Sequence, residues 1–177
     1  LGNHDYSAFV SLGRSGSYAI IGDKENRSSI LKGLKRMVSP VKPTGIIEEE
    51  VLSVKQHAGL VGLLKKTPFK LLENSFDVIS IGKASLTIHG FGEYSLGRMD
   101  EKAPSSKKTD FSIALLHNPD GIPRLKKHHA DLILSGHTHG GQVNLPILRD
   151  RFIVMEDERF FYGLKEISGK KSYTTRG

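Results

Sequence analysis

The apolar positions of this chain follow two different spacings. Before residue 67 they recur every three or four residues, which is the period of a helix. This spacing predicts a helix from Ser28 or Ser29 to about Val38 and a second helix over 47–66. The second helix has an acidic first turn and ends in lysines, which suits the helix dipole. Its predicted apolar face consists of Ile47, Val51, Val54, Ala58 and Val61.

After Pro68 the pattern changes to short apolar runs bounded by turn residues, which is typical of strands. Strands are predicted over 69–72, 76–81, 85–89, 111–116, 131–134, 151–155 and 158–175, with a short helix over about 121–129. Residues 7–23 and 92–110 are predicted to be loops. Alternation of strand, helix and strand in the C-terminal half predicts an α/β fold, in which loops after the strands build the site.

Composition narrows the class of protein. A chain of 177 residues with 37% hydrophobic and 25% charged residues is long enough to fold as one domain. No apolar run approaches the roughly 20 residues of a membrane-spanning helix. The absence of cysteine excludes disulfides, thiolate metal sites and a cysteine nucleophile. Lys and Arg number 26 against 19 Asp and Glu, so the net charge of +7 favours anionic partners.

Candidate chemistry lies at three separated places. His137 and His139 follow an apolar run and are flanked by glycines, which let the backbone turn both imidazoles toward one target. His117 ends another apolar run, and Asn3 lies in a turn sequence at the start of the chain. Each alone has a plainer interpretation. His137 and His139 could lie on a solvated loop, His117 could be a polar strand cap, and Asn3 could be a turn residue. Together they form a mixed imidazole and amide set that suits borderline divalent metals.

These motifs resemble those of the calcineurin-like metallophosphoesterases. The matching stretches are Gly-Asn-His-Asp at 2–5, the strand-ending His117 and Gly-His-Thr-His at 136–139, in the order and with the long gap of that family. The resemblance spans most of the chain and is weakest over 24–66. It implies an α/β fold of four layers, an α/β/β/α sandwich that is incomplete here at the N-terminus. It also implies a single domain over 1–177, with 24–66 as cap or insertion helices.

The resemblance also implies a division of roles within the site. Asn3, His117 and His137 are expected to bind one ion of a dinuclear pair, and His139 to bind the other. His4 is expected to be catalytic, protonating the leaving oxygen or holding the phosphate, with Asp5 orienting it. Two divalent ions are expected, manganese in the first place and iron, zinc or magnesium as alternatives.

Two further stretches resemble one branch of the family more closely. They are His139 to Val143 followed by Leu145-Pro146, and Leu116 to Asp120, with weaker support from Leu96 to Asp100. This branch of membrane-associated phosphoesterases includes a type of UDP-2,3-diacylglucosamine pyrophosphatase. It implies a phosphorylated small-molecule or lipid substrate in lipid A biosynthesis. It further implies a bacterial cytoplasmic location at the membrane face. The basic, amphipathic stretch over 29–38 suits peripheral membrane contact, a cap over the site, or a plain surface helix equally.

Two motifs of the family are missing from this sequence. The early Asp-x-His and the Gly-Asp-x-x-Asp motif, which supply the other ion's ligands and the bridging aspartate, are not found. Gly22-Asp23 comes too late and has Asn26 where an aspartate is needed. We therefore expect them upstream of Leu1, and we expect this chain alone to be inactive.

Two alternatives stay open. The first is a phosphodiesterase with another substrate, such as a cyclic nucleotide or a nucleic acid. The second is a basic nucleic-acid-binding module in which the histidines are incidental. The second lacks the aromatic side chains that stack on bases, since aromatics are 7% and tryptophan is absent. We do not expect nucleic acid to be the partner, and the sequence leaves the oligomeric state open.

Overall fold

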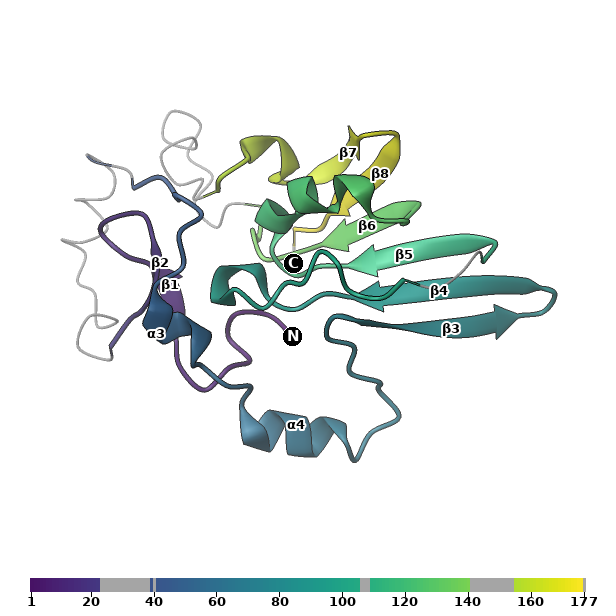
Figure 1. Cartoon of the computed structure of the whole chain (residues 1–177), viewed down its shortest axis with the longest axis horizontal. Coiled ribbons are helices and arrows are strands. Elements are labelled where there is room, and N and C mark those ends of the chain that lie inside the picture. The colour runs from purple at the N-terminus through teal and green to yellow at the C-terminus, as the bar shows by residue number, and fades with distance from the viewer. Residues whose placement is uncertain (23–38, 40, 106–108, 141–154, 177) are drawn as a thin grey trace.

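The computed structural model describes residues 1–22, 39, 41–105, 109–140 and 155–176. Its main feature is a mixed sheet of six strands in the order β3-β4-β5-β6-β8-β7 (Figure 1). The strands are β3 (Ser75–Ile81), β4 (Ala84–Gly90), β5 (Phe111–Leu115), β6 (Leu132–Ser135), β7 (Gly163–Ile167) and β8 (Lys170–Thr174). The four central strands run parallel, and β3 and β7 pair antiparallel at the two edges.

Shorter elements surround this sheet. A small hairpin, β1 (Val10–Leu12) with β2 (Tyr18–Ile20), lies at one end of the molecule, next to the helix α3 (Glu49–Leu52) (Figure 1). A second helix, α4 (Ala58–Leu64), follows. Three 3₁₀ helices complete the described elements: η1 (Tyr94–Leu96), η2 (Pro119–Lys127) and η3 (Glu158–Phe160).

The buried side chains form two clusters. One lies between the sheet and η2 and includes Ala114, Ile122, Leu125 and Ile133, all fully buried. The other joins the β1–β2 hairpin to α3 and η1. Its members are Tyr6, Val10, Leu12, Tyr18, Val51, Val54, Tyr94 and Leu96. Met99 contacts both clusters, so the hairpin end and the sheet share a continuous core.

The predicted strands over 76–81, 85–89, 111–116 and 131–134 are confirmed as β3, β4, β5 and β6. The strand region predicted over 158–175 begins instead with the 3₁₀ helix η3 and then holds β7 and β8. The predicted strand over 69–72 is wrong, since these residues are not in a strand. Residues 7–23 hold the β1–β2 hairpin rather than loop alone, and 92–110 holds η1. The helix expected over 121–129 is a 3₁₀ helix over 119–127. It begins at Asn118, whose side chain accepts a hydrogen bond from the Asp120 amide, and it contains Pro123.

The single helix predicted over 47–66 is also wrong. Two short helices, α3 and α4, stand there, separated by an extended stretch from Val54 to His57. That stretch bonds to the N-terminal loop: the Ser7 amide donates to the Lys55 carbonyl, and the His57 amide donates to the Asp5 carbonyl. Tertiary hydrogen bonds have replaced helical ones there, and helix propensity is too weak to prevent this.

Some predictions fall outside the described residues. These are the helix from 28 or 29 to 38, most of the strand over 151–155, and the stretch Gly141 to Pro146. The architecture is α/β, with one mixed sheet and few helices among the described residues. The four-layer sandwich and the assignment of 1–177 to one domain stay predictions. No helix in the described ranges is long and apolar enough to cross a membrane.

Candidate metal centre

Three loops that are far apart in sequence meet at the carboxyl ends of β5 and β6. His117 lies two residues after β5, and His137 lies two residues after β6. The Leu116 amide donates to the Leu134 carbonyl, and the Gly136 amide donates to the His117 carbonyl, so the two strand ends remain in register. Asn3 approaches from the N-terminal turn and is 7% exposed. The parallel sheet thus places its polar side chains at one edge.

The side chains of these three residues are in contact. The Asn3 Oδ1 lies 3.3 Å from His117 Nε2, and His137 Nδ1 lies 3.2 Å from the same nitrogen. The two imidazole rings meet edge to face, with centroids 5.0 Å apart. Three donor atoms therefore converge from three loops.

Backbone conformation directs His137 into this cluster. His137 and His139 both adopt positive φ angles, 67° and 49°, which are costly for residues with a side chain. The turn is held by Thr138, whose hydroxyl donates to the Phe161 carbonyl over 2.8 Å. Strain of this kind persists where surrounding contacts fix it and is common at functional sites.

Gly2 leaves room for the His117 ring. A Cβ at Gly2 would lie 2.7 Å from His117 Cε1 and Nε2, which is closer than real side chains approach. The Asp5 carboxylate accepts a hydrogen bond from the Gly2 amide over 2.8 Å, which closes the turn that carries Asn3. The motif predicts that Asp5 orients His4, whereas this contact ties Asp5 to the turn. The motif includes Gly2 but does not predict its steric role beside His117.

Both clustered histidines are held in the neutral form. Burial lowers the pKa of His137 to about 4, and the neighbouring His117 adds to this shift. Burial likewise lowers the pKa of His117, and nearby His4 and His139 also act to lower it. Neutral imidazoles keep a free lone pair at pH 7, which is what a metal ligand requires.

The donor set fits a borderline divalent cation. Two ligands at about 2.0–2.1 Å from one tetrahedral cation lie about 3.3 Å apart, close to the two separations in this cluster. Two imidazole nitrogens with one amide oxygen are also ligand types that such cations accept. In the part of the chain that the structure describes, no group of three or more histidine, cysteine, aspartate or glutamate side chains converges. Three donors alone would fill only part of the ligand shell of such a cation.

The other two predicted site residues are exposed. His4 packs against Phe9, with ring centroids 5.2 Å apart, and His139 lies on the turn after His137. Among the described contacts, neither donates or accepts a hydrogen bond within the cluster, although both are close enough to influence its charge. The structure thus brings Asn3, His117 and His137 together and leaves His4 and His139 at the rim.

A groove of about 430 Å³ opens beside His117. Its walls come from the ends of β4, β5 and β6 and include Ser135, whose buried hydroxyl has no hydrogen-bond partner among the described atoms. Sequence reasoning missed this residue, because a serine at a strand end has no motif of its own. Its position directly before Gly136-His137 was the available signal.

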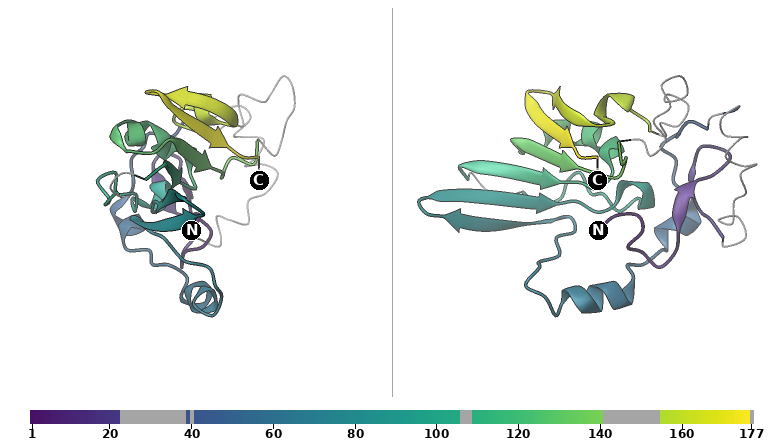
Figure 2. Two further views of the ribbon diagram at one scale, coloured as in Figure 1. Left: turned by 90° about the vertical axis from the view of Figure 1, so that its right-hand side faces the viewer. Right: turned by 180° about the vertical axis from the view of Figure 1, so that it is seen from behind.

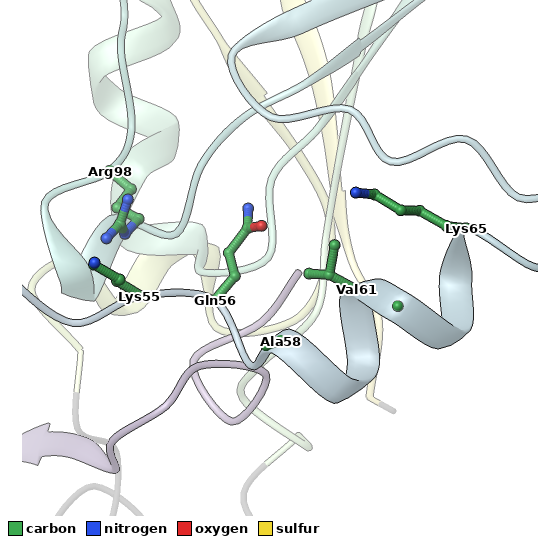
Figure 3. A pocket seen from close by; sticks show the side chains of 7 residues that line it. Lys55, Gln56, Ala58, Val61, Lys65 and Arg98 are labelled. Atoms are coloured by element: carbon green, nitrogen blue, oxygen red, sulfur yellow. The ribbon is translucent and has the colours of Figure 1, made fainter.

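A second hollow, of about 460 Å³, contains none of the clustered histidines. It lies between α4 and Arg98 and has a basic rim of Lys55, Lys65 and Arg98 (Figure 3). Gln56, on its wall, donates to Glu73, and the Arg98 guanidinium donates to the Val54 carbonyl. Its cations are thus partly engaged in holding the extended stretch between α3 and α4.

Sequence comparison places these motifs among known proteins. The chain is 31% identical over 151 residues to phosphodiesterase YaeI of Escherichia coli, covering 85% of this chain and 55% of that protein. It is 32% identical over 157 residues to UDP-2,3-diacylglucosamine pyrophosphatase LpxG of Chlamydia trachomatis, covering 82% and 44%. It is 30% identical over 112 residues to the uncharacterized metallophosphoesterase YkuE of Bacillus subtilis, covering 62% and 39%.

No family model matches the sequence, and no solved structure matches it. The chain spans about half the length of the first two curated relatives. Those relatives match more than four fifths of this chain, so the similarity extends well beyond the motif residues. The chain is therefore a relative of the metallophosphoesterases, as its motifs predict.

Proposed function

We propose that this chain carries part of the active site of a metal-dependent phosphoester or pyrophosphate hydrolase. The observation that supports this most is the convergence of Asn3 Oδ1 and His137 Nδ1 on His117 Nε2, at 3.3 Å and 3.2 Å. Two neutral imidazoles and an amide oxygen at the carboxyl edge of a parallel sheet suit a divalent cation better than they suit packing.

The chain's own residues divide the work as follows. Asn3, His117 and His137 would hold one cation, and His139, on the exposed turn, would bind a second. His4, exposed at the rim, delivers a proton to the leaving oxygen. A bound pair of ions would lower the pKa of a shared water and stabilise charge on the phosphoryl oxygens. Manganese is the proposed metal, with iron, zinc and magnesium as alternatives.

The proposed substrate is UDP-2,3-diacylglucosamine, which would place the protein in lipid A biosynthesis. Support comes from the 32% identity to LpxG and from the net charge of +7, which favours an anionic substrate. Contact with the cytoplasmic membrane face belongs to the same proposal. The identity to YaeI supports a second candidate, a phosphodiesterase with another substrate.

Metal binding by the 177-residue chain tests the ligand assignment without requiring activity. Titration with Mn²⁺, followed by calorimetry or paramagnetic resonance, should show binding that Asn3→Ala, His117→Ala and His137→Ala each weaken at least about tenfold. His129→Ala is the matched control, because His129 is exposed and outside the cluster. Equal affinity in all four variants would refute the assignment.

Hydrolysis is measured in a protein of the relatives' full length that contains this chain. EDTA should abolish turnover and Mn²⁺ restore it, with UDP-2,3-diacylglucosamine preferred over a generic aryl phosphodiester. His4→Ala should slow turnover most with poor leaving groups while the metal stays bound. Tight nucleic-acid binding that weakens steeply with salt and ignores chelators would instead support the nucleic-acid alternative.

A further inference from the structure

A third strand end reaches the candidate metal centre. β8 pairs parallel with β6, so its carboxyl end lies at the same edge of the sheet as the ends of β5 and β6. β4 and β5 share this direction, toward the end of the molecule that carries the β1–β2 hairpin (Figures 1 and 2). The Thr175 amide donates to the Ser135 carbonyl over 2.8 Å, and Thr175 lines the groove beside His117. The loop after β8, which continues with Arg176, therefore lies at the edge that carries the clustered histidines.

Arg176 packs against the turn that follows His137. A Cβ at Gly140 would lie 2.9 Å from Arg176 Cγ, which is closer than real side chains approach. Gly140 also has a φ angle of 61°, which glycine adopts freely. Glycine at this position thus lets the aliphatic stem of Arg176 lie on the turn, one residue beyond His139.

The guanidinium of Arg176 is held by stacking on a ring. Its Cζ lies 4.5 Å from the centroid of Tyr162, which follows Phe161, and the Phe161 carbonyl accepts the hydrogen bond from Thr138 in the same turn. An arginine stacked on an aromatic face keeps its N–H donors free at the edge of its plane. Among the described residues, no carboxylate pairs with Arg176 and no acceptor takes a hydrogen bond from it. Its donors are therefore available to a ligand.

A phosphate group is the anion that such a guanidinium suits best. The planar N–H fork pairs with two phosphate oxygens at once, and charge-assisted bonds of this kind are stronger than neutral ones. Lys70, whose side chain also borders the groove, is already paired with Asp77 over 2.8 Å. Arg176 thus combines a fixed position with an unpaired charge beside the metal centre.

We propose that Arg176 is a substrate-binding residue that holds a phosphate group of the substrate beside the metal centre. This role rests on the proposed function and extends it, because it gives the loop after β8 a part in recognising the anion. Tyr162 and Gly140 fix the guanidinium before the substrate arrives, so little side-chain freedom is lost on binding. Loss of a contact that serves binding alone raises KM and leaves kcat nearly unchanged.

Phosphate affinity tests the proposal in a protein of the relatives' full length that contains this chain. Arg176→Gln keeps the stem that packs on Gly140 and removes the charge, whereas Arg176→Lys keeps the charge and loses the planar fork. Arg124→Gln is the matched control, because Arg124 is likewise exposed and lies over a tyrosine ring, 5.0 Å from the centroid of Tyr94. Calorimetry with inorganic phosphate in the presence of Mn²⁺ gives the dissociation constant of each variant.

Arg176→Gln should weaken phosphate binding at least about tenfold, Arg176→Lys should weaken it less, and Arg124→Gln should change it less than about twofold. With substrate, Arg176→Gln should raise KM and change kcat little, while Mn²⁺ affinity and thermal stability stay as in the original protein. Equal phosphate affinity in Arg176→Gln and the original protein would overturn the proposal. So would a loss of stability or of Mn²⁺ binding that accompanies the weaker phosphate binding, because Arg176 would then be structural.

The same measurements separate this role from the proposed function. If Arg176 governs phosphate affinity in a protein that hydrolyses no phosphoester, the proposed function fails and the role of Arg176 stands. If hydrolysis and its metal dependence are found but Arg176→Gln binds phosphate and substrate normally, the role of Arg176 alone fails.

Discussion

Glu93 shows how a single buried acid is accommodated. Its side chain is 0% exposed, one carboxylate oxygen accepts hydrogen bonds from the Ser95 amide and hydroxyl, and the other has no partner among the described atoms. Burial raises the pKa of Glu93 to about 7. Because the folded state prefers the protonated form, this group's contribution is fully favourable below pH 4.5 and is lost as pH rises through 7.

Glu93→Gln should therefore stabilise the protein at pH 8 and leave it nearly unchanged at pH 4. Glutamine keeps a carbonyl oxygen for Ser95 and removes the cost of a buried charge, which is on the order of 1–3 kcal/mol. Urea unfolding at the two pH values measures the difference. A variant that is less stable than the original at pH 8 would show that the ionised carboxylate is favourable in place.

In the turn between β7 and β8, the backbone conformation conflicts with the residue type at one position. Ser168 and Gly169 have φ angles of 52° and 76°, the positive values that a two-residue type I′ hairpin requires. Glycine adopts such values freely, whereas serine does so at a cost. The hairpin therefore depends on Gly169 and is weakened by Ser168.

Ser168→Asn should stabilise the protein by about 0.5 kcal/mol, because asparagine tolerates the left-handed region better than serine. Gly169→Ala should destabilise it by about 1 kcal/mol. A Cβ there meets open space, so the loss would come from the backbone alone. Thermal unfolding of both variants measures the two effects, and a change of the same sign in both would contradict the assignment of the turn.

Across the whole molecule, buried histidines and buried acids change the free energy of unfolding in opposite directions as pH changes. Burial lowers the pKa of His128 to about 4, and nearby His89, His129 and Lys170 add to the shift. Its ring lies edge-on to His89, with centroids 4.6 Å apart. A histidine with a lowered pKa contributes stability above pH 6.5 that is lost as pH falls through 4. Glu93 acts in the opposite direction over an overlapping range.

His128→Phe should flatten the fall in stability between pH 6.5 and 4 while keeping the edge-on ring contact. The free energy of unfolding, measured by urea titration at pH 7 and pH 5, should drop less on acidification than in the original chain. His129→Phe, at the exposed neighbouring position, serves as the control. If the free energy of unfolding of the His128 variant falls as much as that of the original chain, groups other than His128 cause the loss of stability in acid.

Features of this protein that depend on neighbouring residues could be predicted before the fold was known. Short apolar runs bounded by turn residues located β3, β4, β5 and β6 closely, and the motif around His137 indicated both the class of protein and the residues to examine. These signals are local. An apolar run marks a strand, and a glycine beside a histidine lets the backbone turn, within a span of a few residues. The sequence also indicated Asn3 and His117, first as members of a mixed imidazole and amide set and then through their resemblance to known motifs.

The fold sets the features that depend on contacts between residues far apart in the sequence. It holds two short helices where one helix was predicted over 47–66, because the stretch around Lys55 hydrogen-bonds to the N-terminal loop. It brought Asn3, His117 and His137 within hydrogen-bonding distance, and left His4 and His139 at the rim. Strand register brings His117 and His137 together, and a side-chain contact joins Asn3 to His117 across 114 positions, neither of which a local pattern encodes.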